Sequence, residues 1–150
     1  MRSLLIAAAV AAAASLAGVA QSTASAAPPV AVEIQAHPLS FFPIEFGSWS
    51  ATSGIDDSGG YVRTDARTSP PDRPFGVPGP FKEEFVFTGS QGTFTITAEE
   101  RDTGTEITGV WQIESGTGAY EDASGHGTVA FSASPGLFTL TLTGVVSKVS

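Results

Sequence analysis

The sequence predicts an all-β protein, an eight-stranded antiparallel up-and-down barrel, and three observations support this prediction. Apolar residues alternate with threonines in 93–98 and 137–143, which is the pattern of strands with one buried and one solvated face. Short glycine-rich connections separate such segments, as tight turns between antiparallel neighbours require. Between Val30 and Ser150, no 11-residue window free of Gly and Pro has the apolar spacing of an amphipathic helix.

The first 26 residues are predicted to be an export signal. A short positive start is followed by an apolar, alanine-rich stretch over 4–20 and by a small-x-small cleavage site at 24–26 (Ala-Ser-Ala). Cleavage before Ala27 leaves 27–150, a length suited to a single domain. We therefore expect a secreted, extracellular protein.

Three strands of weaker pattern precede five strands of strong pattern. The weaker segments are 30–34, 45–51 and 60–66. The strong segments follow one another through tight turns and so form an antiparallel meander. They are, in order, 81–87, 93–98, 107–113, 127–133 and 137–143.

Two connections have a distinctive composition. Asp56–Gly60 combines acidic residues with serine and glycine, and a hairpin turn explains it better than a calcium loop, which would need more spaced oxygen ligands and a closing Glu. Residues 67–80 contain five prolines, which withhold sheet donors, so we expect a long connection over one end of the barrel. That connection is either passive or a lid with Phe75 as its apolar tip.

Alternation in twos is equally compatible with a two-sheet β-sandwich. An open arrangement of eight strands without covering helices leaves exposed edges, and closure removes them. Hairpin connections between neighbours also favour an up-and-down order. The barrel is therefore the main prediction, and the sandwich is the alternative.

Charge excludes two classes of partner. The chain has 7 Lys+Arg and 15 Asp+Glu, a formal net charge of −8, and this balance repels phosphate backbones and anionic lipid headgroups. We expect no nucleic-acid partner and, after signal cleavage, no membrane partner.

The same composition predicts neither a metal nor a cofactor. The absence of cysteine excludes disulfides, thiolate metal sites and Cys nucleophiles. His37 and His126 are 89 residues apart and form no His-x-x-x-His pair. The Gly-Thr-Gly at 116–118 lacks the following helix and nearby Lys of a phosphate loop.

Six aromatic residues are predicted to line the barrel interior. They fall on one face of successive strands, and the interior of an eight-stranded barrel is either just filled or just large enough for one ligand. The main hypothesis is that the lumen binds an apolar small molecule. The predicted ligand-binding residues are Phe85, Phe87, Phe94, Trp111, Phe131 and Phe138.

Charged residues on these faces are candidates for catalysis. Glu83 shares the parity of Phe85, and Glu100 shares the parity of Phe94. Both carboxylates then point toward an apolar lumen, where desolvation raises the pKa of a carboxyl group and suits acid/base work. Arg63, on the third weaker strand, is placed to pair with Glu83 or to bind a ligand carboxylate. Alternatively, Glu83 and Glu100 are rim residues that reach solvent and have no function.

The segment 111–128 carries a resemblance to a known family. It combines a tryptophan strand, a Ser-Gly-Thr-Gly-Ala-Tyr turn and a Gly-x-Gly at the start of the next strand. This pattern resembles the allene oxide cyclase barrel-like superfamily, most closely its small secreted, uncharacterised actinobacterial members. The resemblance, over about half the chain, implies an eight-stranded barrel, an activity such as cyclisation or ligand binding, and a possible homo-oligomer. No catalytic residue is carried over, because the matched motif is a turn.

The sequence leaves three functions open. The first is a secreted binder of an apolar small molecule. The second is a cyclase or isomerase in which Glu83, Glu100 or Arg63 gives polar assistance. The third is an extracellular structural or interaction protein with a filled core.

Overall fold

The computed structural model describes residues 28–41, 43–70 and 77–150, and the predicted signal peptide lies outside them. The described chain is almost entirely β-strand. One 3-10 helix, η1 (Gly118–Tyr120), lies between the sixth and seventh strands. The strands are β1 (Val30–Ser40), β2 (Phe46–Ser53), β3 (Ile55–Ser69), β4 (Gly79–Gly89), β5 (Thr93–Asp102), β6 (Ile107–Gly116), β7 (Ser124–Ser134) and β8 (Leu137–Ser147).

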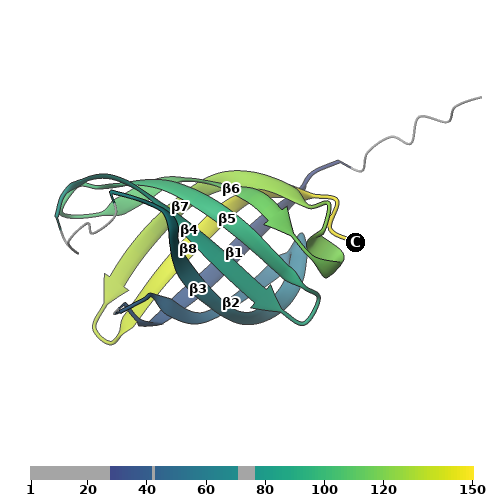
Figure 1. Ribbon diagram of the computed structural model, residues 1–150, viewed down its shortest axis with the longest axis horizontal. Coiled ribbons are helices and arrows are strands. Elements are labelled where there is room, and N and C mark those ends of the chain that lie inside the picture. Colours follow the sequence, from purple (N-terminus) through teal and green to yellow (C-terminus); the bar gives the residue numbers. More distant parts are fainter. Residues whose placement is uncertain (1–27, 42, 71–76) are drawn as a thin grey trace, which may run out of the picture.

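The eight antiparallel strands close into one barrel. Each strand pairs with the next, and β1 pairs with β8 from Val30↔Val146 to Ala36↔Leu140. Figure 1 shows the strands winding diagonally around a common axis. Closure gives every strand two hydrogen-bonded neighbours, so the edge problem of an open sheet is removed. The predicted up-and-down barrel is confirmed, and the sandwich alternative is excluded.

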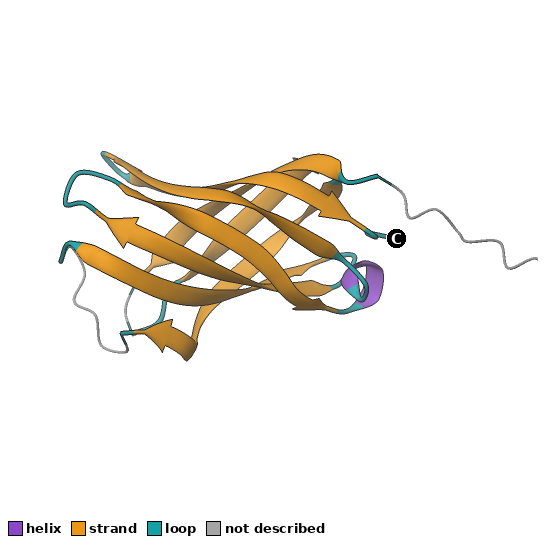
Figure 2. Cartoon of the chain, turned by 90° about the horizontal axis from the view of Figure 1, so that it is seen from above, coloured by secondary structure: helices purple, strands orange, loops and turns teal. Residues whose placement is uncertain are grey.

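The two ends of the barrel have different elements. The β2–β3, β4–β5 and β6–β7 connections lie at the same end as the C-terminus and η1; we call this the terminal end (Figures 1 and 2). The β1–β2, β3–β4, β5–β6 and β7–β8 connections lie at the opposite end, which we call the distal end.

The predicted hairpin turn at Asp56–Gly60 is wrong. These residues belong to β3, and the β2–β3 turn is instead at Gly54, whose φ of +69° suits a residue without Cβ. The side chain of Asp57 points into the barrel and is only 9% exposed. A carboxylate at such a position needs hydrogen-bond donors, and the sequence segment itself does not reveal them.

Asp57 obtains one donor from its neighbour Ser58 and the others from two connections at the terminal end. Its carboxylate accepts from Ser90 N (3.0 Å), Ser90 Oγ (2.8 Å), Gln91 N (3.1 Å), Ser58 N (2.8 Å) and Tyr120 Oη (2.8 Å). Burial alone raises the pKa of Asp57, but the hydrogen bonds from Ser90, Gln91, Ser58 and Tyr120 together hold it well below its ordinary value. This carboxylate therefore ties β3, the β4–β5 turn and η1 together.

The proline-rich connection is shorter than the predicted 67–80. Strand β3 continues to Ser69 and β4 starts at Gly79, so the ends of the predicted loop are strand. Pro80 is compatible with β4 because it is the second residue of the strand, where a missing ladder donor is tolerated. Phe75 lies outside the described residues, and its lid function stays a prediction.

Both tryptophans are accommodated by glycines on the neighbouring strands. Trp49 of β2 faces Gly59 of β3, and Gly59 faces Gly89 of β4. The carbonyl oxygen of Thr88 occupies the space that a Cβ on Gly59 would need. This oxygen accepts a hydrogen bond from Trp49 Nε1 at 3.1 Å. The glycine thus lets an indole on β2 bond to the backbone of β4, two strands away.

The opposite side of the barrel repeats this arrangement. Trp111 of β6 faces Gly127 of β7, and Gly127 faces Gly144 of β8. The carbonyl oxygen of Thr143 occupies the Cβ position of Gly127 and accepts a hydrogen bond from Trp111 Nε1 at 3.4 Å. In both copies the accepting residue immediately precedes the second glycine. We call these two arrangements the tryptophan brackets.

The brackets predict that alanine destabilises the barrel at one of two adjacent glycines and is tolerated at the other. Gly59→Ala places a methyl group on the Thr88 carbonyl and should reduce the free energy of unfolding by about 2–4 kcal/mol. Gly60→Ala is the control: the nearest atom to its new Cβ is 3.7 Å away and its φ is not positive, so we expect a change within about 0.5 kcal/mol. Urea denaturation followed by tryptophan fluorescence measures both. Equal stability of the two variants would contradict the bracket.

Candidate functional site

Three of the predicted wall residues form a packed aromatic cluster inside the barrel. Phe85, Phe87 and Phe94 are each at most 1% exposed. The rings of Phe87 and Phe94 stack with centroids 5.0 Å apart, and Trp49 meets them edge-on at 5.6 and 5.3 Å. Tyr120 of η1 contacts Phe94 from the terminal end at 5.0 Å. These are favourable ring geometries, and protein side chains fill this part of the lumen.

The other predicted wall residues make no ring contact with Phe85, Phe87 or Phe94 in the described structure, although Trp111 belongs to the same buried core and Phe131 packs against it. Trp111 is 2% exposed and is held by its bracket. Phe131 and Phe138 flank the β7–β8 turn at the distal end, with rings 6.0 Å apart and nearly parallel. Phe41, from the β1–β2 connection, meets them edge-on at 6.3 and 5.1 Å. Phe41, Phe131 and Phe138 are only partly buried; we call them the distal aromatic group.

Four polar side chains on the inward face of the barrel are connected by hydrogen bonds and charge contacts. Arg63 Nη1 donates to Glu83 Oε1 at 3.1 Å and lies 3.9 Å from Glu45 Oε2. Tyr61 donates its O–H to Glu45 Oε1 at 2.8 Å. The side chains of Arg63, Glu83 and Glu45 are 22%, 14% and 9% exposed. We call Glu45, Tyr61, Arg63 and Glu83 the interior polar group.

The backbone fixes this group in place. Arg63 N donates to the Glu45 carbonyl at 2.8 Å, so the residue before β2 is tied to β3. Arg63 faces Phe85 across the β3–β4 ladder, and Glu83 is the next inward position of β4. Side chains at such diagonal positions reach each other when they are long. The predicted pairing of Arg63 with Glu83 is confirmed by their contact.

The interior polar group changes the proton affinity of its members. Burial raises the pKa of Glu45 to about 7, the negative charge of Glu83 adds to the rise, and the Tyr61 hydrogen bond and the Arg63 charge oppose it. Burial and the neighbouring Glu45 carboxylate raise the pKa of Tyr61 above its ordinary value. Glu45 therefore exchanges its proton near neutral pH while Tyr61 keeps its own, which is the condition for acid/base work.

Glu100 is more buried than a rim residue would be. It is 5% exposed and faces Phe81 of β4 and Gly109 of β6. Strand β5 continues past it to Asp102, so its position is interior to the sheet. Glu83 faces Ala98, the inward position next to Glu100 along β5. The two predicted catalytic carboxylates therefore occupy neighbouring inward positions, and Glu83 is bonded to Arg63.

Sequence reasoning missed two members of the polar group. A signal for Glu45 existed, because alternation along 45–51 places it on the same face as Trp49. Tyr61 likewise shares the face of Arg63. Their contact could not be predicted, since it joins a connection to a strand through a register that only the folded backbone defines.

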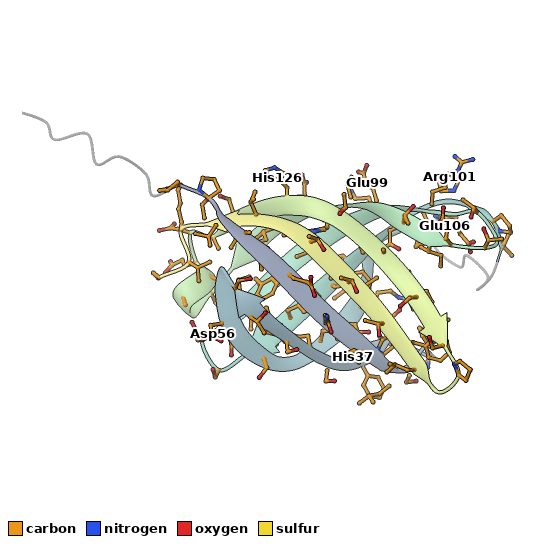
Figure 3. The ribbon with its side chains drawn as sticks, turned by 180° about the vertical axis from the view of Figure 1, so that it is seen from behind. His37, Asp56, Glu99, Arg101, Glu106 and His126 are labelled. Atoms are coloured by element: carbon orange, nitrogen blue, oxygen red, sulfur yellow. The ribbon has the colours of Figure 1, made fainter. Side chains whose placement is uncertain are left out.

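The two histidines do not form a joint site. Figure 3 shows His37 and His126 on the outside of different strands. His37 contacts Thr139 of β8, whereas His126 pairs with Val145, and six residues along a strand span about 20 Å. Across 28–41, 43–70 and 77–150, no group of three or more His, Cys, Asp or Glu residues could hold a metal ion. No helix in these ranges has the length and apolar character of a membrane span.

Comparison with known proteins gives no family. Neither a family model, nor a curated protein, nor a solved structure matches this chain. The resemblance to the allene oxide cyclase barrel-like superfamily therefore stays a prediction.

The raised pKa of Glu45 predicts that the free energy of unfolding falls as pH rises. Between pH 4.5 and 7 the folded protein holds a proton on Glu45 that the unfolded chain releases, so the free energy of unfolding should fall by about 3 kcal/mol across that interval. Glu45→Gln keeps an acceptor for Tyr61 but carries no titrating proton, and should remove this fall. Urea denaturation at pH 5 and pH 8 measures the difference.

Glu99→Gln is the control for this prediction. Glu99 is exposed on β5 and pairs with Lys82 at 3.1 Å, so its substitution should retain the pH dependence of the unaltered protein. A protein whose stability is the same at both pH values would contradict the assignment to Glu45.

Proposed function

We propose that this is a secreted barrel that binds one small molecule with an apolar body and a polar end in the distal half of its lumen. The observation that carries the proposal is the joint presence there of the interior polar group and the distal aromatic group. The β1–β2 connection contributes to both, because Phe41 belongs to one group and Glu45 to the other. A site of this kind, mostly apolar with a few placed polar atoms, is typical of small-molecule pockets.

The apolar body would rest on aromatic rings of two kinds. Phe131 and Phe138 retain some exposure and would contact the ligand directly. Phe85, Phe87 and Phe94 are packed against one another and would form the floor beneath it. Offset or edge contacts with such rings favour a flat or flexible apolar body.

The polar end would meet the interior polar group. A neutral Glu45 can donate a hydrogen bond to a ligand oxygen, and an ionised Glu45 can accept one from a ligand hydroxyl. Burial strengthens such bonds and penalises a ligand that lacks the polar end. The predicted export signal supports a role outside the cytoplasm.

Binding is tested with Nile red, a neutral apolar dye, and with native mass spectrometry. The protein purified from its own culture medium should carry a retained small molecule, and the emptied protein should bind Nile red at one site. Phe138→Ala should weaken dye binding about tenfold or more, because the bound dye loses its apolar contact with the Phe138 ring. Leu137→Ala, which alters an adjacent outward residue that is 53% exposed, should leave it unchanged. Absence of both a retained molecule and dye binding would favour the filled-core alternative.

A second candidate function, proton-transfer catalysis of the cyclase or isomerase sort, is favoured by one observation. Glu45 has a pKa of about 7 and lies beside the Arg63 guanidinium, which can stabilise negative charge on a substrate oxygen while Glu45 takes a proton from carbon.

Deuterium exchange distinguishes catalysis from binding. The molecule released from the protein is incubated in D₂O with the unaltered protein or with Glu45→Gln. Catalysis predicts deuterium at a carbon of the molecule, and loss of Glu45 should slow its entry at least about a hundredfold. No deuterium incorporation with the unaltered protein would leave binding as the function.

A further inference from the structure

Large exposed apolar side chains gather at the distal end of the barrel. Within the described part of the chain, six of the eight lie there or directly beside it, on the β1–β2, β3–β4 and β7–β8 sides. The two others are Val30, at the terminal end, and Val110, on the wall of β6 beside Glu99 and Thr128. The six are Leu39 (75% exposed), Ile44 (41%), Phe46 (48%), Val62 (38%), Val77 (46%) and Leu137 (53%).

These six exposed side chains lie on separate strand ends and connections, and we call them the rim. Leu39 is the residue before the last one of β1, Ile44 lies in the β1–β2 connection, and Leu137 starts β8 after the β7–β8 turn. Phe46 pairs with Val62 on the outside of β2 and β3. Exposed apolar side chains grouped at one end of a molecule mark a protein or a membrane interaction site. Side chains on separate connections can each enter the boundary between headgroups and acyl chains.

The net charge of the protein determines which kind of lipid surface the rim can approach. The chain has a formal net charge of −8, which opposes both an anionic membrane and face-to-face docking of a second copy. Of the cations whose side chains the structure describes, Lys82 is paired with Glu99, Arg63 is bonded to Glu83 inside the barrel, and Lys148 lies at the terminal end. Arg101 is exposed near the distal end (Figure 3), directly before Asp102, so these residues do not form a basic patch on the rim. A zwitterionic lipid surface carries no net charge and avoids this repulsion.

We propose that the distal end docks on a neutral, zwitterionic lipid surface, with Leu39, Ile44 and Leu137 inserted at the interface. The expectation of no membrane partner was drawn from repulsion by anionic headgroups and does not extend to neutral ones. The distal aromatic group lies within this rim, so the lipid surface is also the source from which an apolar ligand enters the lumen. That last step rests on the ligand-binding function proposed above; the docking itself does not.

The test is flotation with vesicles of phosphatidylcholine alone. The protein without its signal segment should float with the vesicles. The triple variant Leu39→Asn/Ile44→Asn/Leu137→Asn should lower the partition coefficient at least about tenfold, because each apolar tip loses its burial. Val110→Asn, a substitution at a side chain that is 55% exposed but away from the rim, should float like the unaltered protein. Circular dichroism checks that both variants are folded.

Three results would overturn the docking proposal. The first is equal flotation of the triple variant and the unaltered protein. The second is binding that requires added anionic phosphatidylglycerol, which would indicate an electrostatic surface. The third is a dimer in analytical ultracentrifugation that the triple variant dissociates, which would assign the rim to a second copy of the chain.

Nile red in vesicle-free buffer separates this proposal from ligand binding. The triple variant should retain dye binding, because its substitutions are outside the lumen. If the unaltered protein floats but does not bind dye, docking is supported and the proposed ligand binding is contradicted. If it binds dye but does not float, ligand binding is supported and docking is contradicted.

Discussion

The carbonyl oxygens of Thr88 and Thr143 occupy the volumes that side chains on Gly59 and Gly127 would need, and each accepts the N–H of a tryptophan. A closed barrel of eight strands has a narrow interior, so a large ring on one strand requires a small residue on the next. The glycines meet this requirement and also let the indole N–H find a backbone acceptor. Burial of an indole without an acceptor would cost stability, so glycine placement and tryptophan placement depend on each other.

The division of the lumen follows from this constraint. Trp49, fixed by its bracket, provides the edge on which Phe87 and Phe94 pack. Tyr120 closes that cluster from the terminal end, and its hydroxyl is held by Asp57. Inward positions toward the distal end are not needed for this packing and can carry charged residues. The interior polar group occupies such positions, whereas Asp57, the buried carboxylate at the terminal end, is bonded to Tyr120 of the aromatic cluster.

The strands could be predicted because alternation is a local property of the sequence. Contacts between residues that are far apart in the sequence could not be predicted in this way. Glu83 and Arg63 were both recognised as inward by parity, and their strands are neighbours, so their contact could be expected. Asp57 was misjudged because its local sequence resembles a turn, while its donors Ser90 and Tyr120 are 33 and 63 residues away. Phe41 was missed because a ring in a connection has no periodicity to reveal its direction.

Asp57 and Glu45 show how two buried carboxylates in one barrel acquire opposite properties. Asp57 accepts hydrogen bonds from four residues, and they lower its pKa despite its burial. Glu45 has the Tyr61 hydroxyl and a guanidinium at 3.9 Å that is closer to Glu83, so burial dominates and its pKa rises. A carboxylate held by hydrogen bonds from four residues suits a structural joint. A buried carboxylate with a raised pKa lowers stability at neutral pH and can exchange a proton there. The difference in hydrogen bonding, rather than burial itself, separates Asp57, which joins elements of the framework, from Glu45, which belongs to the candidate site.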